Sequence, residues 1–199
     1  MSQMMDDVLY SKIEMALFRS HLEAIVSVTI ASADILSADM ALLKFLVKDK
    51  KMKGSIICVD RDYKQMEELA KSIDLGGDDL YYIDAVTLYN GKNPDASASD
   101  KTVFIDSPSD LTSMDIAITD MIEKLENGFL LFDCLSSLKL YNDSKKLGIF
   151  MHDLASKLRL YGVFGVILLI EEDSDTWLHS IIKAFCDKNV VLKTGRDIT

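Results

Sequence analysis

The sequence predicts an α/β protein with a mostly parallel central sheet that helices cover on both faces. Short apolar runs alternate with amphipathic segments along the chain, as in consecutive strand–helix units. The run at 163–170 is almost wholly apolar, as expected of a strand that is buried on both faces. Hydrophobic residues make up 49% of the chain and charged residues 27%, which is typical of a packed globular fold.

Seven segments predict strands because each concentrates β-branched or other apolar residues. They are, in order, 24–31, 55–60, 80–86, 103–105, a segment that starts at 128, 163–170 and 189–193. The first holds Ile25, Val26, Val28 and Ile30, whose branched Cβ atoms favour an extended backbone. We expect the sixth to be a central strand of the sheet.

Six segments predict helices because their apolar residues are spaced three and four apart. They cover 4–20, 37–47, a stretch around 66–73, a stretch from 107–109 to about 126, 143–161 and 175–187. We expect Gly76 and Gly77 to end the third unit. Ser107, Pro108 and Ser109 should combine a turn with the capping residues of the fourth helix. The polar residues 90–100 predict an exposed loop.

The length of 199 residues favours a single domain. We expect an N-terminal helix within 1–21, an α/β core over 22–193 and a tail at 194–199. A formal charge of −10 repels phosphate backbones, so direct nucleic-acid binding is not expected. Five lysines lie close together, where a solvated surface is favoured over a site for an anionic partner. They are Lys44, Lys48, Lys50, Lys51 and Lys53.

The chain has no predicted membrane span, because its longest apolar run is far shorter than the roughly 20 residues needed to cross a bilayer. Its start lacks the basic and apolar regions of a secretion signal. Cys58, Cys134 and Cys186 form no C-x-x-C pair, which predicts reduced, buried thiols. We therefore expect a cytoplasmic protein.

The sequence lacks the glycine-rich turn that holds phosphate in P-loop ATPases. Its first glycine is Gly54, and the pattern G-x-x-x-x-G-K-[ST] occurs nowhere. The Gly-Lys pair at 91–92 is followed by Asn93. Such a turn needs glycine because several backbone N–H groups must point inward, in conformations that a Cβ atom disfavours. ATP and Mg²⁺ are therefore not expected as cofactors.

Acidic residues follow several predicted strands, at the edge where parallel α/β sheets bind ligands. They are Asp60, Asp62, Asp106, Asp133, Glu171, Glu172 and Asp173. Such a rim offers oxygen ligands for Mg²⁺ or groups that polarise water. Solvated strand ends and helix caps explain the same residues without a ligand, so no metal site is predicted.

The most specific motif is the segment Asp133-Cys134-Leu135-Ser136-Ser137-Leu138, which follows the apolar run at 129–132. Together with the acidic turn at 58–62 and the segment 150–170, it resembles the RecA superfamily. The likeness is greatest to the KaiC-like and RadA/Rad55-like ATPases found widely in archaea. Their strand ends in Asp-Ser-Leu-Ser-x-Leu, so Asp133 matches the Walker-B-like aspartate and Cys134 replaces the first serine.

This resemblance implies a three-layer α/β/α fold of the RecA type. It places Asp60 and Asp62 where KaiC-like enzymes carry acidic residues that polarise the attacking water, with Asp instead of the usual Glu. It also places 31–37 at the phosphate-loop position. Ser32, Ala33, Asp34 and Ser37 stand there without glycine or lysine, and the charge of Asp34 would oppose a triphosphate. The chain thus resembles a relative of these ATPases that lacks the P-loop.

We expect a domain that does not hydrolyse nucleotide and acts as a protein-interaction, scaffold or regulatory module, with a protein partner or a second copy of itself. The alternative is a sensor or enzyme that binds a metal or small ligand at the acidic rim. A DNA-repair accessory role rests on the Rad55-like resemblance alone. A receiver domain is disfavoured because no acidic pair follows the first strand, and the chain has no G-x-S-x-G nucleophile elbow.

Overall fold

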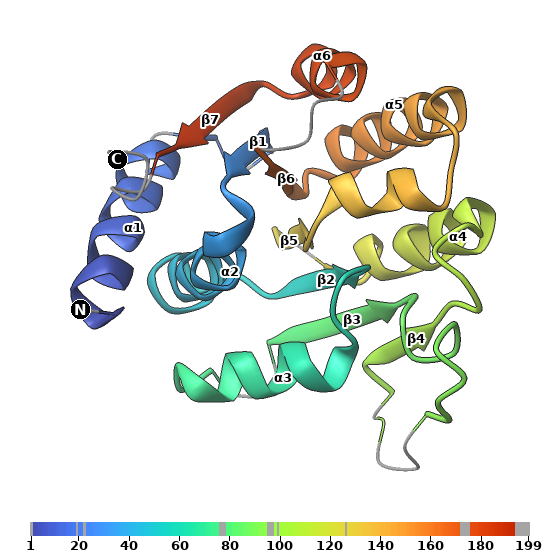
Figure 1. The fold of residues 1–199 in the computed structure, drawn as a ribbon, viewed down its shortest axis with the longest axis horizontal. Helices are drawn as coiled ribbons and strands as arrows, with labels where there is room; N and C mark the ends of the chain where they lie inside the picture. The colour runs from blue at the N-terminus through green and yellow to red at the C-terminus, as the bar shows by residue number, and fades with distance from the viewer. Residues whose placement is uncertain are drawn as a thin grey trace.

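A computed structural model describes residues 2–18, 20–21, 23–75, 79–94, 98, 100–125, 127–171 and 176–193, without the side chains of 2–6 and 176. The predicted tail at 194–199, Gly76 and Gly77, and part of the predicted loop lie outside these ranges. One sheet lies between two layers of helices (Figure 1). The predicted three-layer α/β/α class is therefore confirmed.

Seven strands form the sheet in the described part of the chain. They are β1 (Ile25–Ile30), β2 (Gly54–Cys58), β3 (Leu80–Asp84), β4 (Thr102–Phe104), β5 (Phe129–Phe132), β6 (Phe164–Ile170) and β7 (Lys188–Leu192). Their order is β4-β3-β2-β5-β6-β1-β7, and every pairing is parallel. All seven predicted strands are confirmed. As predicted, β6 lies inside the sheet and is buried along almost its whole length.

The helices divide into two groups, one on each face of the sheet (Figure 1). The first hydrophobic cluster holds α1 (Ser2–Leu17), α2 (Ile35–Leu43) and α3 (Tyr63–Ser72) against one face. The second holds α4 (Leu111–Ile122), α5 (Ser144–Tyr161) and α6 (Thr176–Phe185) against the other. Burial of apolar side chains on both faces explains why the strands are so uniformly hydrophobic.

The largest differences from the predicted helix bounds are at the second and fourth helices. The helix expected from residue 37 begins earlier, with a 3-10 turn η1 (Ser32–Asp34) that leads directly into α2. It continues beyond Leu43 as a π-helix, η2 (Lys44–Asp49). The fourth helix ends at Ile122 and not near 126, because the chain turns after Glu123 to enter β5.

The predicted cap of α4 is wrong by one residue. The N-cap is Asp110, whose carboxylate accepts a hydrogen bond from the Ser113 N–H at 2.9 Å. Ser107 and Ser109 instead hydrogen-bond to each other through their hydroxyl groups, at 2.8 Å, within the preceding turn. A cap side chain accepts the N–H two or three residues after it, and Asp110 lies three residues before Ser113.

The three cysteines are buried and free, as predicted. Burial raises the pKa of the Cys58 and Cys134 thiols well above the usual value, which keeps them protonated and unreactive. No helix in the described ranges has both the length and the apolarity that crossing a bilayer demands.

Candidate functional site at the ends of β2 and β5

The strands β2 and β5 are neighbours, and their chains leave the sheet in opposite directions. After β2 the chain enters α3 on the first face, and after β5 it runs through the 3-10 helix η3 (Leu135–Leu140) to α5 on the second face. In open α/β sheets, ligands bind in the crevice that opens where neighbouring connections diverge in this way. The residues at these two strand ends therefore define the candidate site.

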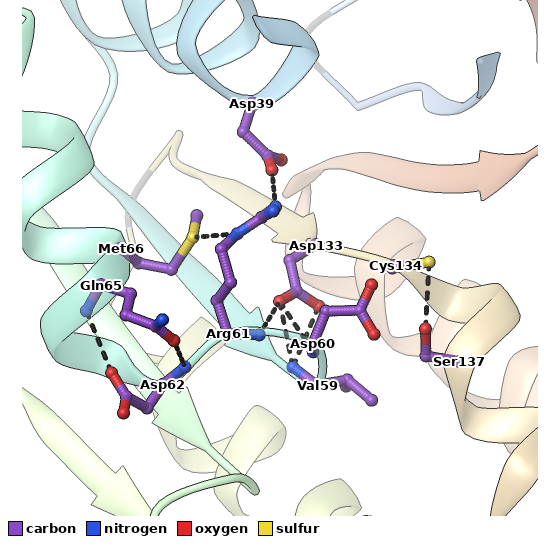
Figure 2. A network of polar contacts seen from close by, with 10 residues as sticks. All are labelled: Asp39, Val59, Asp60, Arg61, Asp62, Gln65, Met66, Asp133, Cys134 and Ser137. Atoms are coloured by element: carbon purple, nitrogen blue, oxygen red, sulfur yellow. Dashed lines mark hydrogen bonds and ion pairs between the residues drawn. The ribbon is translucent and has the colours of Figure 1, made fainter. Parts of the chain in front are cut away.

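The Asp133 carboxylate lies between these two strand ends and points toward the loop that follows β2 (Figure 2). The side chain is fully buried and accepts hydrogen bonds from the N–H groups of Val59 at 3.0 Å, Asp60 at 3.2 Å and Arg61 at 3.4 Å. These N–H groups belong to the loop between β2 and α3. The predicted strand 55–60 ends at Cys58 because the backbone turns there toward this carboxylate. Asp133 thus holds the loop in place.

The electrostatic surroundings of Asp133 favour its neutral form. Burial, together with the negative charge of Asp60, raises the pKa of Asp133 to about 7, while the N–H donors and Arg61 act in the opposite direction. The carboxyl group therefore exchanges its proton near neutral pH.

The rest of the motif at 133–138 binds the neighbouring strand. The Ser136 hydroxyl accepts a hydrogen bond from the Ile170 N–H, at the end of β6, at 3.1 Å. The Ser137 hydroxyl donates to the Cys134 sulfur at 3.3 Å. The motif that carried the family resemblance therefore connects β5 to the strands on both of its sides.

Arg61 connects the β2–α3 loop to α2. Its guanidinium group forms an ion pair with Asp39, and its Nε lies 3.4 Å from the Met66 sulfur (Figure 2). Asp39 is fully buried, and burial raises its pKa well above the usual value despite the charge of Arg61. Its Oδ1 has no hydrogen-bond partner among the described residues. The ion pair therefore satisfies one of the two oxygens.

The two acidic residues predicted after β2 have different roles in the structure. The Asp60 side chain is exposed. Asp62 is buried and is the N-cap of α3, where it accepts the Gln65 N–H at 3.0 Å in a capping box and pairs with Lys92 at 2.9 Å. Burial opposes its ionisation, but Lys92 and the Gln65 N–H lower its pKa overall. Asp62 therefore stabilises a helix end.

The phosphate-loop position is a closed turn. The Asp34 N–H donates to the Ala31 carbonyl at 2.9 Å, and the Ile35 N–H donates to the Ser32 carbonyl. These bonds use N–H groups that a phosphate cradle would have to turn inward. Residues 31–37 are all described, and none of them has a positive φ. Asp34 is buried, whereas Ser32 and Ala33 are exposed and Ser37 is half-buried.

The remaining predicted rim residues do not join the site. Asp106 and Glu171 are exposed at the ends of other strands, and Glu172 and Asp173 lie outside the described residues. Within the described ranges, no three His, Cys, Asp or Glu side chains are grouped so that they could hold a metal ion.

The sequence analysis missed three residues that organise this edge of the sheet. Asp39 and Arg61 form the buried ion pair, and Asp84 accepts hydrogen bonds from the N–H groups of Tyr63 and Thr87, both at 2.8 Å. A signal existed for Asp39, because a carboxylate within the apolar run 38–43 must find a partner when the helix is buried. The partner itself could not be identified, since Arg61 is distant in the sequence.

Comparison with protein families gives one match that covers most of the chain. The model of a family of unknown function (DUF7504) matches residues 44–192. The chain belongs to this family. The matched part of the DUF7504 chain begins in η2 and includes Asp60 and Asp133, whereas the phosphate-loop position at 31–37 precedes it. No curated protein sequence matches the chain.

Among solved structures, the DUF7504 chain is similar to the KaiC-like protein PH0186 from the hyperthermophilic archaeon Pyrococcus horikoshii OT3. The TM-score is 0.60, and the match covers 89% of this chain and 74% of that chain at 12% identity. A likeness at this identity shows the fold alone. The predicted RecA/KaiC-like fold is therefore confirmed.

Proposed function

We propose that this DUF7504 chain is a non-hydrolysing KaiC-like domain that works through protein contacts, as an interaction, scaffold or regulatory module. The observation that carries the proposal is the state of Asp133. Its carboxylate is buried and accepts three backbone N–H groups of its own chain. A carboxylate that orders Mg²⁺ must instead offer oxygen atoms to the ion or its waters.

The turn after β1 supports the same proposal. The N–H groups of Asp34 and Ile35 already donate to backbone carbonyls, and the buried carboxylate of Asp34 lies in the same turn. A triphosphate would have to break these hydrogen bonds and approach a negative charge.

Three basic side chains that could pair with a phosphate already have partners. Arg61 pairs with Asp39, and Lys92 pairs with Asp62. The Lys44 ammonium lies 4.3 Å from the centre of the Tyr10 ring. Each of them would lose an existing interaction on binding a phosphate.

Isothermal titration calorimetry with Mg-ATP, together with a phosphate-release assay, tests the proposal. We expect neither saturable binding up to millimolar nucleotide nor turnover. A micromolar dissociation constant that is lost in Lys44→Ala or Lys92→Ala would overturn it. Separately, sedimentation of the full chain alone shows whether the chain binds a second copy of itself.

A second candidate function is binding of a metal or small ligand other than a triphosphate at the acidic rim. It is favoured by the exposed carboxylate of Asp60, which directly follows β2 and whose charge acts on the neighbouring Asp133. A thermal-shift screen of divalent cations and metabolites tests it, because a ligand that binds the folded state alone raises the melting temperature. The shift should disappear in Asp60→Asn and persist in Asp106→Asn, an exposed strand-end control. A screen without any shift removes this candidate.

A further inference from the structure

A groove separate from the β2–β5 site lies between the first turns of α4 and α5. Its volume is about 420 Å³, and its lining includes the apolar side chains of Leu111, Ile149 and Phe150. Neither the family resemblance nor the proposed function assigns a role to it. The volume is within the range of sites that bind several side chains or a small molecule.

Both helices that form the groove expose a large apolar residue to solvent. Ile149 on α5 lines the groove and is 56% exposed. Ile116 on α4 is 57% exposed and lies one helical turn after Thr112, which also lines the groove. The exposed side chain of Ile149 gives the groove an apolar wall whose burial by a partner would be favourable.

The polar lining of the groove is mainly acidic. Asp110, Asp115 and Asp153 contribute carboxylates, and Lys146 contributes one cation, which already lies 3.4 Å from Asp143. Hydrogen bonds to the Ser113 side chain and backbone lower the pKa of Asp110, so this group stays charged at neutral pH. The lining therefore attracts a cationic partner.

Asp115 already has a partner within the chain. Its Oδ2 pairs with Lys157 at 2.6 Å, whereas its Oδ1 has no hydrogen-bond partner among the described residues. Lys157 also donates to the Thr119 hydroxyl at 2.9 Å, so this lysine links α5 to α4. Because Oδ1 is also buried, Asp115 contributes its negative charge to the groove and not a free acceptor.

We propose that the α4–α5 groove docks a basic amphipathic helix of a partner protein. Two side-by-side helices with apolar walls accept the apolar face of a third helix, whose anchors recur every three to four residues. Lysine or arginine residues that flank this face would meet Asp110, Asp115 and Asp153. The inference rests on the proposed function, since it names the surface and the class of partner that a protein-interaction module would use.

A defined peptide tests this assignment on the full chain. The probe is a capped, fluorescent peptide of about 14 residues with leucine at helical spacing and lysine elsewhere, compared with an analogue that has glutamate in place of lysine. We expect saturable binding of the basic peptide at physiological salt, and affinity for the acidic analogue that is lower by at least about tenfold. Equal binding of both peptides, or no saturable binding of the basic one, would overturn the proposal.

Matched variants locate the binding. Ile149→Asp and Asp153→Lys should each weaken binding of the basic peptide by about tenfold, because each removes one type of groove contact. Leu160→Asp and Asp120→Lys make the same chemical changes at exposed positions outside the groove lining, and should change affinity by less than about twofold. Equal effects of groove and control variants would show non-specific attraction and contradict the proposal.

A photo-cross-linking version of the basic peptide gives a result that does not depend on variants. Cross-links should fall within 109–115 and 146–153 of the wild-type chain. Cross-links elsewhere would contradict the proposed docking site. Phosphate release is measured on the same samples: ATP turnover contradicts the proposed function whatever the peptide does, whereas failed peptide binding without turnover removes the docking site alone.

Discussion

At the scale of single residues, one buried carboxylate and one buried ion pair organise the strand ends. Asp133 accepts three N–H groups of the β2–α3 loop, and Arg61 of the same loop reaches Asp39 on α2. Each group is costly to bury alone and is stabilised by its partners. Changes at these residues should therefore affect stability strongly.

Asp133→Ala should lower the free energy of unfolding by about 3 kcal/mol, because the N–H groups of Val59 and Asp60 lose a buried acceptor. Urea denaturation measures this change. Asp106→Ala, at an exposed strand-end position, is the control and should change stability by less than about 0.5 kcal/mol. Similar values for the two variants would contradict the anchoring role.

The raised pKa of Asp133 predicts a pH dependence of stability. The pKa is about 7 in the folded chain against an ordinary value of 3.8, so the folded state binds this proton more tightly than the unfolded state. The resulting stabilisation is complete below the ordinary pKa and is lost as the pH rises through about 7. Asp133→Asn retains an acceptor oxygen but does not titrate. Its unfolding free energy should fall less than that of the wild type between about pH 5 and pH 8, and parallel curves would refute the assignment.

Removal of Arg61 should be more damaging than removal of the whole ion pair. Arg61→Met leaves the buried Asp39 carboxylate without its cation, at a cost of about 3–5 kcal/mol. The double variant Asp39→Ala/Arg61→Met also removes the unpartnered carboxyl group, so it should lose less stability than Arg61→Met alone. Chemical denaturation of all four proteins gives the coupling energy. Strict additivity would show that the two side chains do not interact.

At the scale of elements, the strand–helix connections decide whether this edge of the sheet is open or closed. Between β1 and α2 the chain has room for only Ala31 and one 3-10 turn. The short connection uses its own N–H groups, in contrast to a loop that wraps an anion. Closure is therefore a property of the connection and does not depend on one side chain.

The start of β2 depends on a close approach between elements. A Cβ atom at Gly54 would lie 2.3 Å from the ring of Phe129, its partner in β5. Gly54→Ala should destabilise the fold by about 1–3 kcal/mol through overpacking. In Gly54→Ala/Phe129→Leu the smaller side chain should relieve part of this strain, so the loss should be less than additive when thermal unfolding is measured. An additive loss would contradict the steric explanation.

At the scale of the whole molecule, charge limits the possible partners. The chain carries 32 acidic against 22 basic residues, a formal net charge of −10. Such a molecule repels the backbone of nucleic acids and attracts basic surfaces, which agrees with the acidic groove between α4 and α5.

We expect no saturable binding of duplex DNA at physiological salt, because the net charge supplies no counterion release. Fluorescence anisotropy with a labelled duplex measures this, with a basic DNA-binding protein as the positive control. Saturable binding that weakens as salt increases would contradict the expectation and would favour the DNA-repair accessory role.

Much of the element pattern was readable from the sequence because it depends on local periodicity. The apolar runs of β2, β5 and β6 and the regular face of α5 correctly predicted strands and a helix. Caps were harder, since Asp62 has the same position after a strand whether it serves a ligand or a helix end. The structure assigns it to the N-terminus of α3.

The sequence alone determined the fold class, the absence of a G-x-x-x-x-G-K-[ST] motif and the acidic charge, because these follow from composition, order and short-range spacing. The tertiary structure decided where the polar groups are satisfied. Asp133 and Val59 lie 74 residues apart along the chain, yet they hydrogen-bond because parallel pairing makes β2 and β5 neighbours. Asp39 and Arg61 meet because α2 packs beside the loop that follows β2, and buried charges find partners only once the elements have packed.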